Sequence, residues 1–441
     1  MHAQSGLTLS PHRCAAATAD SPSWAGRTDL PVCPPFATKV EFHAVDRAAR
    51  RTLILVAAAE LLGTTLWFSG TAAIPELTRV WRSDLSVGAW LTMSVQLGFV
   101  TGALLVALFN LPDIFKASRV FAASAIGAAA ANAAFAWIAP GSIAGALVMR
   151  FLTGAFIAGM YPVGMKILSG WFRDGRGTAL GILVGALTVG KAAPYAVAGA
   201  SALPWQWMAF TCSGFALLAA LLIAMGVQEG PYSAPQPPLD LHQVGAILHN
   251  RPLPLANLGY FGHMWELYSM WGWIALMLAA SAGEQNRAVA WGAFAAIASG
   301  AIGCVWAGRV ADHGAGVTSL QDRLARRARV TIIAMSVSGA CCLLAAAVFQ
   351  HFWLLLVVSI VWGISIVADS AQFSAIVSEV SDKRYVGTAL ALQTAVGFLL
   401  TVVSIRVMGA IGEHLGWPWA AAAMSIGPAL GIIAMRRLQT E

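Results

Sequence analysis

Residues Leu255 to Ala280 read LANLGYFGHMWELYSMWGWIALMLAA. This stretch is long enough to cross a bilayer, because about 20 apolar residues in a helix span roughly 30 Å of hydrocarbon. It also carries His263 and Glu266, which are three residues apart and therefore share one face of a helix. A charged side chain at the bilayer centre costs about 2.5–3.5 kcal/mol on insertion scales. The stretch therefore predicts a membrane-spanning helix whose polar face has a partner, a cavity or a bound proton.

The composition of the whole chain is that of a polytopic membrane protein. The chain has 441 residues, of which 58% are hydrophobic and 11% charged, whereas soluble domains carry about 25% charged residues. The formal net charge is +7, but the basic residues stand in short loops between apolar runs, so we predict no nucleic-acid partner. The six cysteines show no CxxC and no zinc-ligand spacing. We predict neither a metal site nor a cofactor.

The apolar runs predict an all-α membrane fold with twelve transmembrane helices. Residues 1–51 precede them and are interpreted as a disordered cytoplasmic tail or as a start-site artefact. The runs cover residues 52–74, 86–108, 118–138, 141–163, 178–200, 205–227, 255–280, 288–310, 328–348, 351–375, 386–408 and 416–435. Residues 228–254 are rich in proline and are interpreted as a linker. We therefore predict two pseudo-symmetric six-helix halves, 52–227 and 255–437.

Basic residues segregate between alternate loops. Eighteen lysines and arginines flank the runs on one side, and only Arg79, Arg82 and Arg287 lie on the other. Cytoplasmic loops carry the excess of such residues. Both termini and the linker are therefore predicted to be cytoplasmic, in a multi-pass protein of the cell (inner) membrane.

Short sequence matches recur between the two predicted halves at nearly one offset. The matches are Gly177-Thr178-Ala179-Leu180 with Gly387-Thr388-Ala389-Leu390 (387 − 177 = 210), Glu60-Leu61 with Glu266-Leu267 (266 − 60 = 206), and Asp113 with Asp312 (312 − 113 = 199). This favours two parallel repeats, a layout of transporters whose halves rock about a midplane site.

With these motifs the chain resembles the major facilitator superfamily. The loop signature of that family is best kept in Gly308-Arg309-Val310-Ala311-Asp312-His313, and its first copy is reduced to Asp113 with Lys116 and Arg119 behind it. Arg150-Phe151-Leu152-Thr153-Gly154 looks like the R-x-x-x-G motif of the fourth span. The resemblance implies a conformational latch at Asp113, Arg119, Gly308 and Asp312.

The chain also resembles a bacterial group often filed with nitrate/nitrite porters. Tyr161-Pro162-Val163-Gly164-Met165-Lys166 and Ala368-Asp369-Ser370-Ala371-Gln372-Phe373 are similar to segments of that group. The asparagine- and glycine-rich nitrate signature of spans five and eleven is missing. The resemblance therefore implies the fold and transport, and not nitrate as the substrate.

Six ionisable residues fall within the predicted spans: Glu60, Arg150, Lys191, Glu266, Asp369 and Arg406. Arg150 and Lys191 are candidates for holding a substrate anion, although structural ion pairs would serve equally. Arg406 lies near a span end, where snorkelling to the interface explains it. Further candidates for substrate contact are Tyr260, Trp265 and Gln393.

Proton coupling is assigned to Glu60, His263, Glu266 and Asp369. Burial in hydrocarbon favours the neutral form of a carboxyl group, and the alternative is a protonated glutamate bonded between helices. We expect Glu266 to carry the coupling proton, with His263 beside it, and Glu60 to be its counterpart in the other half.

The prediction is a proton-coupled secondary transporter, not an enzyme, that moves a small polar, anionic solute and works as a monomer in the bilayer. The first alternative is efflux of cationic amphiphiles by proton antiport, although Gly190-Lys191-Ala192-Ala193-Pro194 departs from the antiporter signature of span five. A second alternative is metal-ion uptake through His263, Met264, Met270 and Met277. A sensor or a channel is disfavoured because the chain shows no soluble signalling domain.

Overall fold

The computed structural model describes residues 39–172, 175–200, 204–233, 252–312, 319–382 and 386–440, without the side chains of residues 39–46 and 311–312. Two compact units divide the chain, Met1–Ala44 and Val45–Glu441. Nearly all of the first unit lies outside the described residues, and so does most of the predicted linker. The bundle of long helices belongs to the second unit.

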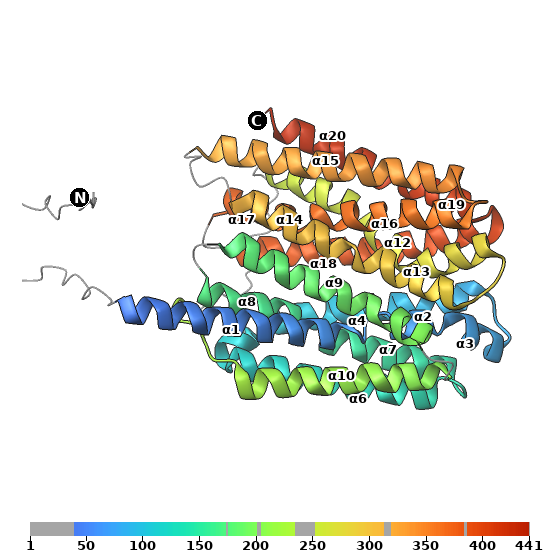
Figure 1. Ribbon diagram of the computed structural model, residues 1–441, viewed down its shortest axis with the longest axis horizontal. Helices are drawn as coiled ribbons and strands as arrows, with labels where there is room; N and C mark the ends of the chain where they lie inside the picture. Colours follow the sequence, from blue (N-terminus) through green and yellow to red (C-terminus); the bar gives the residue numbers. More distant parts are fainter. Residues whose placement is uncertain are drawn as a thin grey trace, which may run out of the picture. The chain divides into compact units, whose positions relative to one another are not determined.

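All regular elements within the described ranges are helices, which confirms the predicted all-α class. Long helices of the second unit lie side by side along one direction (Figure 1). The helices are α1 (Lys39–Thr64), α2 (Ser69–Ala72), α3 (Ile74–Trp81), α4 (Leu85–Leu108), α5 (Leu111–Ile114), α6 (Ala117–Ile138), α7 (Ile143–Ile157), α8 (Tyr161–Trp171), α9 (Arg176–Ala200), α10 (Trp205–Gly226), α12 (Pro252–Ala282), α13 (Arg287–Ala298), α14 (Gly300–Asp312), α15 (Leu320–Ala347), α16 (Phe352–Ala368), α17 (Ser370–Val380), α18 (Val386–His414), α19 (Trp417–Met424) and α20 (Ile426–Leu438).

Eleven segments of the described chain are long and apolar enough to cross a membrane. Five of them join helices that follow one another directly, such as Arg47–Trp81 and Phe352–Val380. The predicted seventh span corresponds to α12, which has 31 residues but is not among the eleven. Its tyrosines, tryptophans, His263 and Glu266 lower its mean hydropathy, so composition alone does not assign it to the membrane. The count of twelve spans remains a prediction.

Several helices are longer than the apolar runs that predicted them. The first span continues through two breaks to Trp81, and α15 begins at Leu320, before the predicted start at residue 328. Ser319 caps α15, because its hydroxyl accepts the Asp322 N–H at 3.1 Å. Arginine is a good helix former, so the arginine-rich first turns of α15 are helical as well. A hydropathy pattern detects only the apolar part of this helix, which is why the predicted span starts later.

The two predicted halves contact each other mainly through two groups of helices. Helix α4 packs against α18, and α9 packs against α13 and α14. Gly308 of α14 approaches α9 so closely that a Cβ there would lie 2.7 Å from the carbonyl oxygen of Gly177. Helix α9 thus packs against the second predicted half, and α12 packs against α18 and α20.

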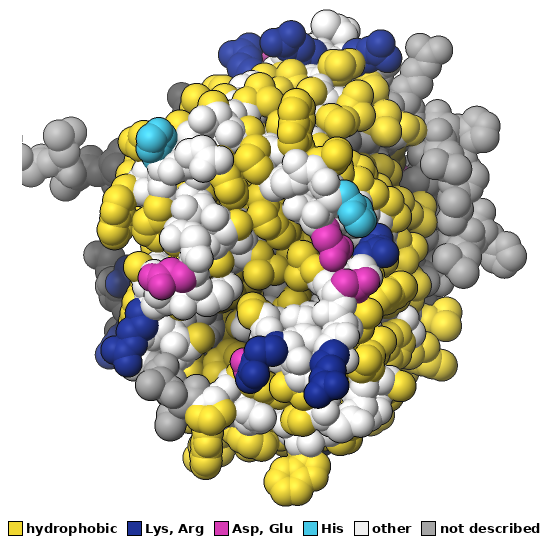
Figure 2. All heavy atoms as spheres, turned by 90° about the vertical axis from the view of Figure 1, so that its right-hand side faces the viewer, with side chains coloured by type: hydrophobic (Ala, Val, Ile, Leu, Met, Phe, Trp, Pro, Cys, Tyr) yellow, Lys and Arg dark blue, Asp and Glu magenta, His cyan; other side chains and the backbone are white. Residues whose placement is uncertain are grey.

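One end of the second unit, at which α3 and α19 lie, faces the viewer in Figure 2. Hydrophobic side chains occupy the centre of this face, and charged and histidine side chains lie around them, some next to one another. This is the end that the distribution of lysine and arginine predicts to face away from the cytoplasm.

Candidate functional site

Lys191 of α9 lies among three aromatic side chains. Its Nζ donates a hydrogen bond to the Tyr268 hydroxyl at 2.6 Å and lies 4.0 Å from the ring centroid of Trp67, 4.8 Å from that of Tyr268 and 5.1 Å from that of Trp271. Ring faces within about 6 Å attract a cation. We call Trp67, Tyr268 and Trp271 the aromatic cage. Lys191 is only 4% exposed, so these rings take the place of water around its ammonium group.

The aromatic cage belongs to a larger group of rings. Phe99 of α4 lies 4.9 Å from Trp67 and 4.5 Å from Phe398 of α18, and Phe398 lies 5.1 Å from Tyr268. The indole N–H groups of Trp67 and Trp271 are buried and have no acceptor among the described residues. The cage therefore offers apolar surface and two free donors where the predicted halves meet.

Glu60 of α1 is completely buried, and neither of its carboxyl oxygens has a hydrogen-bond partner within the part of the chain that the structure describes. Opposite it on α8 stands Gly164, where a Cβ would lie 3.3 Å from Glu60 Oε2. Lys191 is near enough to interact with it electrostatically. A buried carboxylate without a partner is costly. Glu60 is therefore the neutral acid here, or it gains a partner in another conformation.

Glu266 of α12 has a different environment. It accepts hydrogen bonds from Trp362 Nε1 at 2.6 Å, Ser338 Oγ at 2.9 Å and Cys342 Sγ at 3.2 Å. These donors lie on α15 and α16, and Glu266 is 1% exposed. Both carboxyl oxygens are thus engaged by the helices around α12.

His263 contacts Asp369 and not Glu266. Its Nδ1 lies 2.8 Å from Asp369 Oδ1, and both side chains are buried. Asp369 stands where span ten breaks between α16 and α17. The rings of Tyr260 and Phe373 lie 6.0 Å and 5.6 Å from the His263 ring. The spacing of His263 and Glu266 correctly placed both in the interior, but their partners come from different helices.

Arg150 of α7 holds the break in the first span. Its guanidinium donates to Asn132 Oδ1 at 2.9 Å, to Ser69 Oγ at 3.1 Å, and to the carbonyl oxygens of Leu66 and Trp67. The chain is not helical between α1 and α2, so these carbonyls lack helical partners. The Nη1 and Nη2 groups of Arg150 donate to uncharged acceptors, and its Nε has no partner among the described residues. Arg150 contacts the backbone of Trp67, whereas Lys191 lies against the ring of Trp67.

Two further candidates lie apart from the aromatic cage. Trp265 packs against α19 and α20, with its Nε1 3.5 Å from the carbonyl oxygen of Ala423 and its ring beside Gly427. Gln393 Nε2 donates to Asn257 Oδ1 at 3.0 Å, which joins α18 to α12. Arg406 is an exposed residue of α18.

The four residues of the latch that the resemblance implies have different surroundings. Asp113 forms an ion pair with Lys166 of α8, and Lys166 also donates to the carbonyl oxygen of Pro112 at 2.9 Å. Arg119 is exposed. Gly308 lies against α9, and the side chain of Asp312 is outside the described residues. Asp113 is therefore tied to the end of span four through Lys166.

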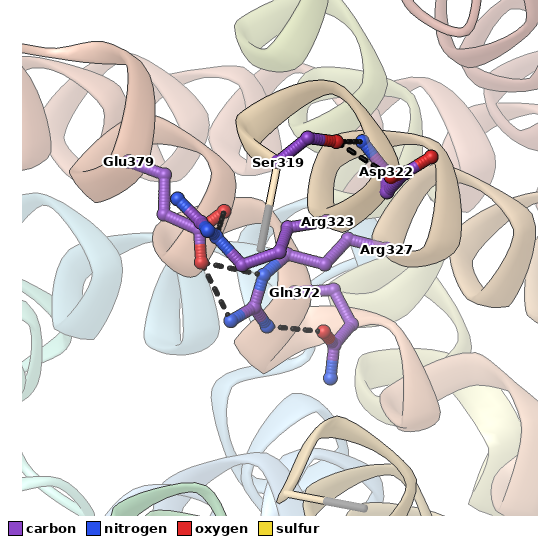
Figure 3. A network of polar contacts seen from close by, with 6 residues as sticks. All are labelled: Ser319, Asp322, Arg323, Arg327, Gln372 and Glu379. Carbon is purple, nitrogen blue, oxygen red and sulfur yellow. Dashed lines mark hydrogen bonds and ion pairs between the residues drawn. The ribbon is translucent and has the colours of Figure 1, made fainter. Parts of the chain in front are cut away.

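A polar network in the second predicted half was not expected. Arg327 of α15 donates to Glu379 Oε1 of α17 at 2.8 Å and to Gln372 Oε1 at 2.8 Å, while Arg323 Nε lies 3.7 Å from Glu379 Oε2 (Figure 3). Gln372 Nε2 reaches the carbonyl oxygen of Ala307 on α14 at 3.5 Å. The arginines between residues 323 and 329 and the acidic Glu379 were visible signals for it.

The aromatic cage was not predicted either. Tyr268 and Trp271 are three residues apart on α12, so a shared face was predictable. Their convergence with Trp67 on Lys191 depends on how the first span, α9 and α12 pack, which the sequence does not show.

A helical fold with eleven membrane-length apolar segments in its described part is that of a polytopic membrane protein. The family model of the Major Facilitator Superfamily matches residues 53–320 and 315–441, and the chain belongs to this family. Members of the family are membrane transporters, so the partners of this chain are a small-molecule substrate and the lipid bilayer. A comparison with curated proteins found no match.

Proposed function

We propose that the chain is a proton-coupled secondary transporter of the inner membrane that moves a small solute by alternating access, and that Glu60 carries the proton. The observation that supports this most is the pair of unbonded carboxyl oxygens of Glu60 near Lys191. A difference of one pH unit across the membrane is worth about 1.4 kcal/mol per proton, so one proton can drive about a tenfold solute gradient per pH unit.

Glu60 suits this task better than Glu266, although the sequence favoured Glu266. A coupling group has to gain and lose its proton as its surroundings change. Glu266 has three donors that compensate a negative charge in this conformation. Glu60 has none among the described residues, so its charge depends on the approach of Lys191 or of a ligand.

Alternating access is supported by burial. Glu60 is 0% exposed and Lys191 is 4% exposed. A solute cannot reach either side chain from water without a rearrangement of the helices around them. The contacts of α4 with α18 and of α9 with α14 are where such a rearrangement would separate the predicted halves.

The charge of the solute follows from the same geometry. The expected anion site needed Arg150 and Lys191 together, but the Nη1 and Nη2 groups of Arg150 donate to carbonyl, amide and hydroxyl oxygens. The aromatic cage favours the alternative, export of organic cations by proton antiport, because ring faces attract cations.

The test uses the full chain in proteoliposomes that contain a pH-sensitive dye. Substrate-driven proton movement should be lost in Glu60→Gln and kept in Glu413→Gln, whose side chain is exposed at the end of α18. Unchanged proton movement in Glu60→Gln would exclude Glu60 as the coupling residue.

A further inference from the structure

The ammonium group of Lys191 occupies the aromatic cage as a tethered ligand would. We propose that an organic cation of the substrate replaces this ammonium group in the cage, while Lys191 turns to neutralise a Glu60 that has released its proton. This rests on the proposed role of Glu60.

The cage itself indicates the chemical class of the substrate. Three aromatic rings have their centroids 4.0–5.1 Å from Lys191 Nζ, and one of them, Tyr268, accepts a hydrogen bond from it through its hydroxyl, the only such acceptor among the described residues. A quaternary or tertiary ammonium group needs few hydrogen bonds and gains most from such faces. Phe99 and Phe398 continue the apolar surface beyond Trp67 and Tyr268, so an apolar body attached to the cation has a place.

Lys191 has a second position within reach. Helices α9 and α1 approach each other closely at Gly190, where a Cβ would lie 2.2 Å from the carbonyl oxygen of Leu61. Lys191 follows Gly190 in α9, and Glu60 precedes Leu61 in α1. Both have long side chains that can reach across this contact between the two helices. Rotation of Lys191 out of the cage therefore brings a cation to the one buried glutamate whose oxygens have no donor among the described residues.

The other titratable groups around this pair do not replace either member. Glu60 faces Lys191 on α9 and Tyr161 at the start of α8. Lys191 faces Glu60 and the Tyr268 hydroxyl. Glu266 is bonded to α15 and α16, and Asp369 is paired with His263.

Charge conservation then fixes the direction of coupling. With the neutral acid of Glu60 and Lys191 in the cage, the pair carries one positive charge. With a Glu60 carboxylate, a Lys191 ammonium and a bound monovalent cation, the sum is again one positive charge. One proton therefore leaves when one cation binds, and the two ligands exclude each other. The result is an electroneutral exchange that responds to a pH gradient and not to membrane potential.

Binding to the purified full chain in detergent provides the test, with benzyltrimethylammonium as the probe and tryptophan fluorescence as the readout. Lys191→Ala removes the tethered competitor, so the affinity for the probe should rise about tenfold. Lys191→Met should give the same rise while keeping the side-chain volume. Lys116→Ala, at an exposed loop position, serves as the matched control and should bind like the parent.

A second pair of variants tests the cage itself. Trp271→Leu should lower the affinity about tenfold, whereas Trp137→Leu changes a tryptophan that is 83% exposed and should have no effect. Weaker binding of the cation in both Lys191 variants would overturn the proposal. Binding of benzoate that is lost in Lys191→Ala would do so as well, because Lys191 would then be an anion site.

The proposed function and this inference fail in different ways. If the probe binds more tightly to Lys191→Ala but its affinity does not depend on pH, the cage stands and Glu60 is not the coupling residue. If a pH gradient drives the uptake of another solute, and the probe binds neither to the parent protein nor to Lys191→Ala, the coupling stands and the cation proposal is wrong.

Discussion

Glu60 and Glu266 occupy matching places in the two predicted halves, each followed by leucine, yet their surroundings differ. Glu266 accepts three hydrogen bonds from α15 and α16, and it lies on α12, which is continuous from Pro252 to Ala282. Glu60 has no donor among the described residues, and the first span breaks shortly after it, between α1 and α2. Matching positions in the two halves therefore differ in their hydrogen bonding, because the groups that donate to each glutamate come from other helices.

The break in the first span offers the largest expected effect. Arg150→Ala would leave the carbonyl of Trp67 without its donor, and the single hydroxyl proton of Ser69 could then serve only one of Leu66 O and Asn132 Oδ1. Each buried polar group left unsatisfied costs about 1–3 kcal/mol, so we expect a loss of at least about 2 kcal/mol in stability. Thermal unfolding in detergent measures it. Arg406→Ala, at an exposed site, is the control. Equal stability of the two variants would show that Arg150 does not stabilise the break in the first span.

The two glutamates themselves should respond differently to the same change. Glu266→Gln presents an amide nitrogen where one oxygen now accepts a hydrogen bond, which should destabilise the protein by about 1–2 kcal/mol. Glu60→Gln replaces a neutral acid that has no donors among the described residues and breaks no hydrogen bond there, so its loss of stability should be smaller than that of Glu266→Gln. Denaturation of both variants under one condition compares them. A larger loss in Glu60→Gln would show that Glu60 has a structural partner.

The ion pairs on the predicted cytoplasmic side should matter less. Lys166→Ala removes the partner of Asp113 in one half, and Arg327→Ala removes the link from α15 to Glu379 in the other. Partly exposed ion pairs contribute about 0–1 kcal/mol. Arg327→Ala should cost more, because it also leaves Gln372, which is 3% exposed, without a partner for its Oε1. Equal melting temperatures would contradict this ranking.

The smallest effect concerns the helix caps at the start of spans two and eight. Asp84 Oδ1 accepts the Val87 N–H at 3.2 Å, and Asn286 Oδ1 accepts the Val289 N–H at 3.0 Å. The hydrogen bond from the Ser86 hydroxyl, followed by the Val87 bond, lowers the pKa of Asp84 below its usual 3.8. The stability that the Asp84 carboxylate contributes as a helix cap is therefore present above pH 3.8 and is lost as the pH falls through its lowered pKa.

The cap formed by Asn286 cannot titrate, so only the Asp84 cap should weaken in acid. Hydrogen-exchange protection of the Val87 amide, relative to that of Val289, should fall below about pH 4. Parallel changes at both amides would indicate general unfolding in place of a local titration.

The sequence by itself determined the class of the protein. Apolar runs of membrane length, separated by short loops with segregated lysine and arginine, indicate a bundle of membrane helices whatever the packing, because hydropathy and helix length are local properties. The interior positions of Glu60, Arg150, Lys191, His263, Glu266 and Asp369 were also predictable, since each falls within an apolar run and is buried in the structure.

Tertiary structure alone decided which of these residues meet. Residues 191, 67 and 271 come from three different spans, residues 263 and 369 from two, and no spacing along one helix relates them. Helical period fixes the face on which a side chain stands, but the partner on that face is set by the packing of helices distant in sequence. For this reason the sequence put Lys191 beside Arg150 and His263 beside Glu266. The fold instead gave Lys191 an aromatic cage, tied Arg150 to the backbone of the first span and left Glu60 without a donor among the described residues.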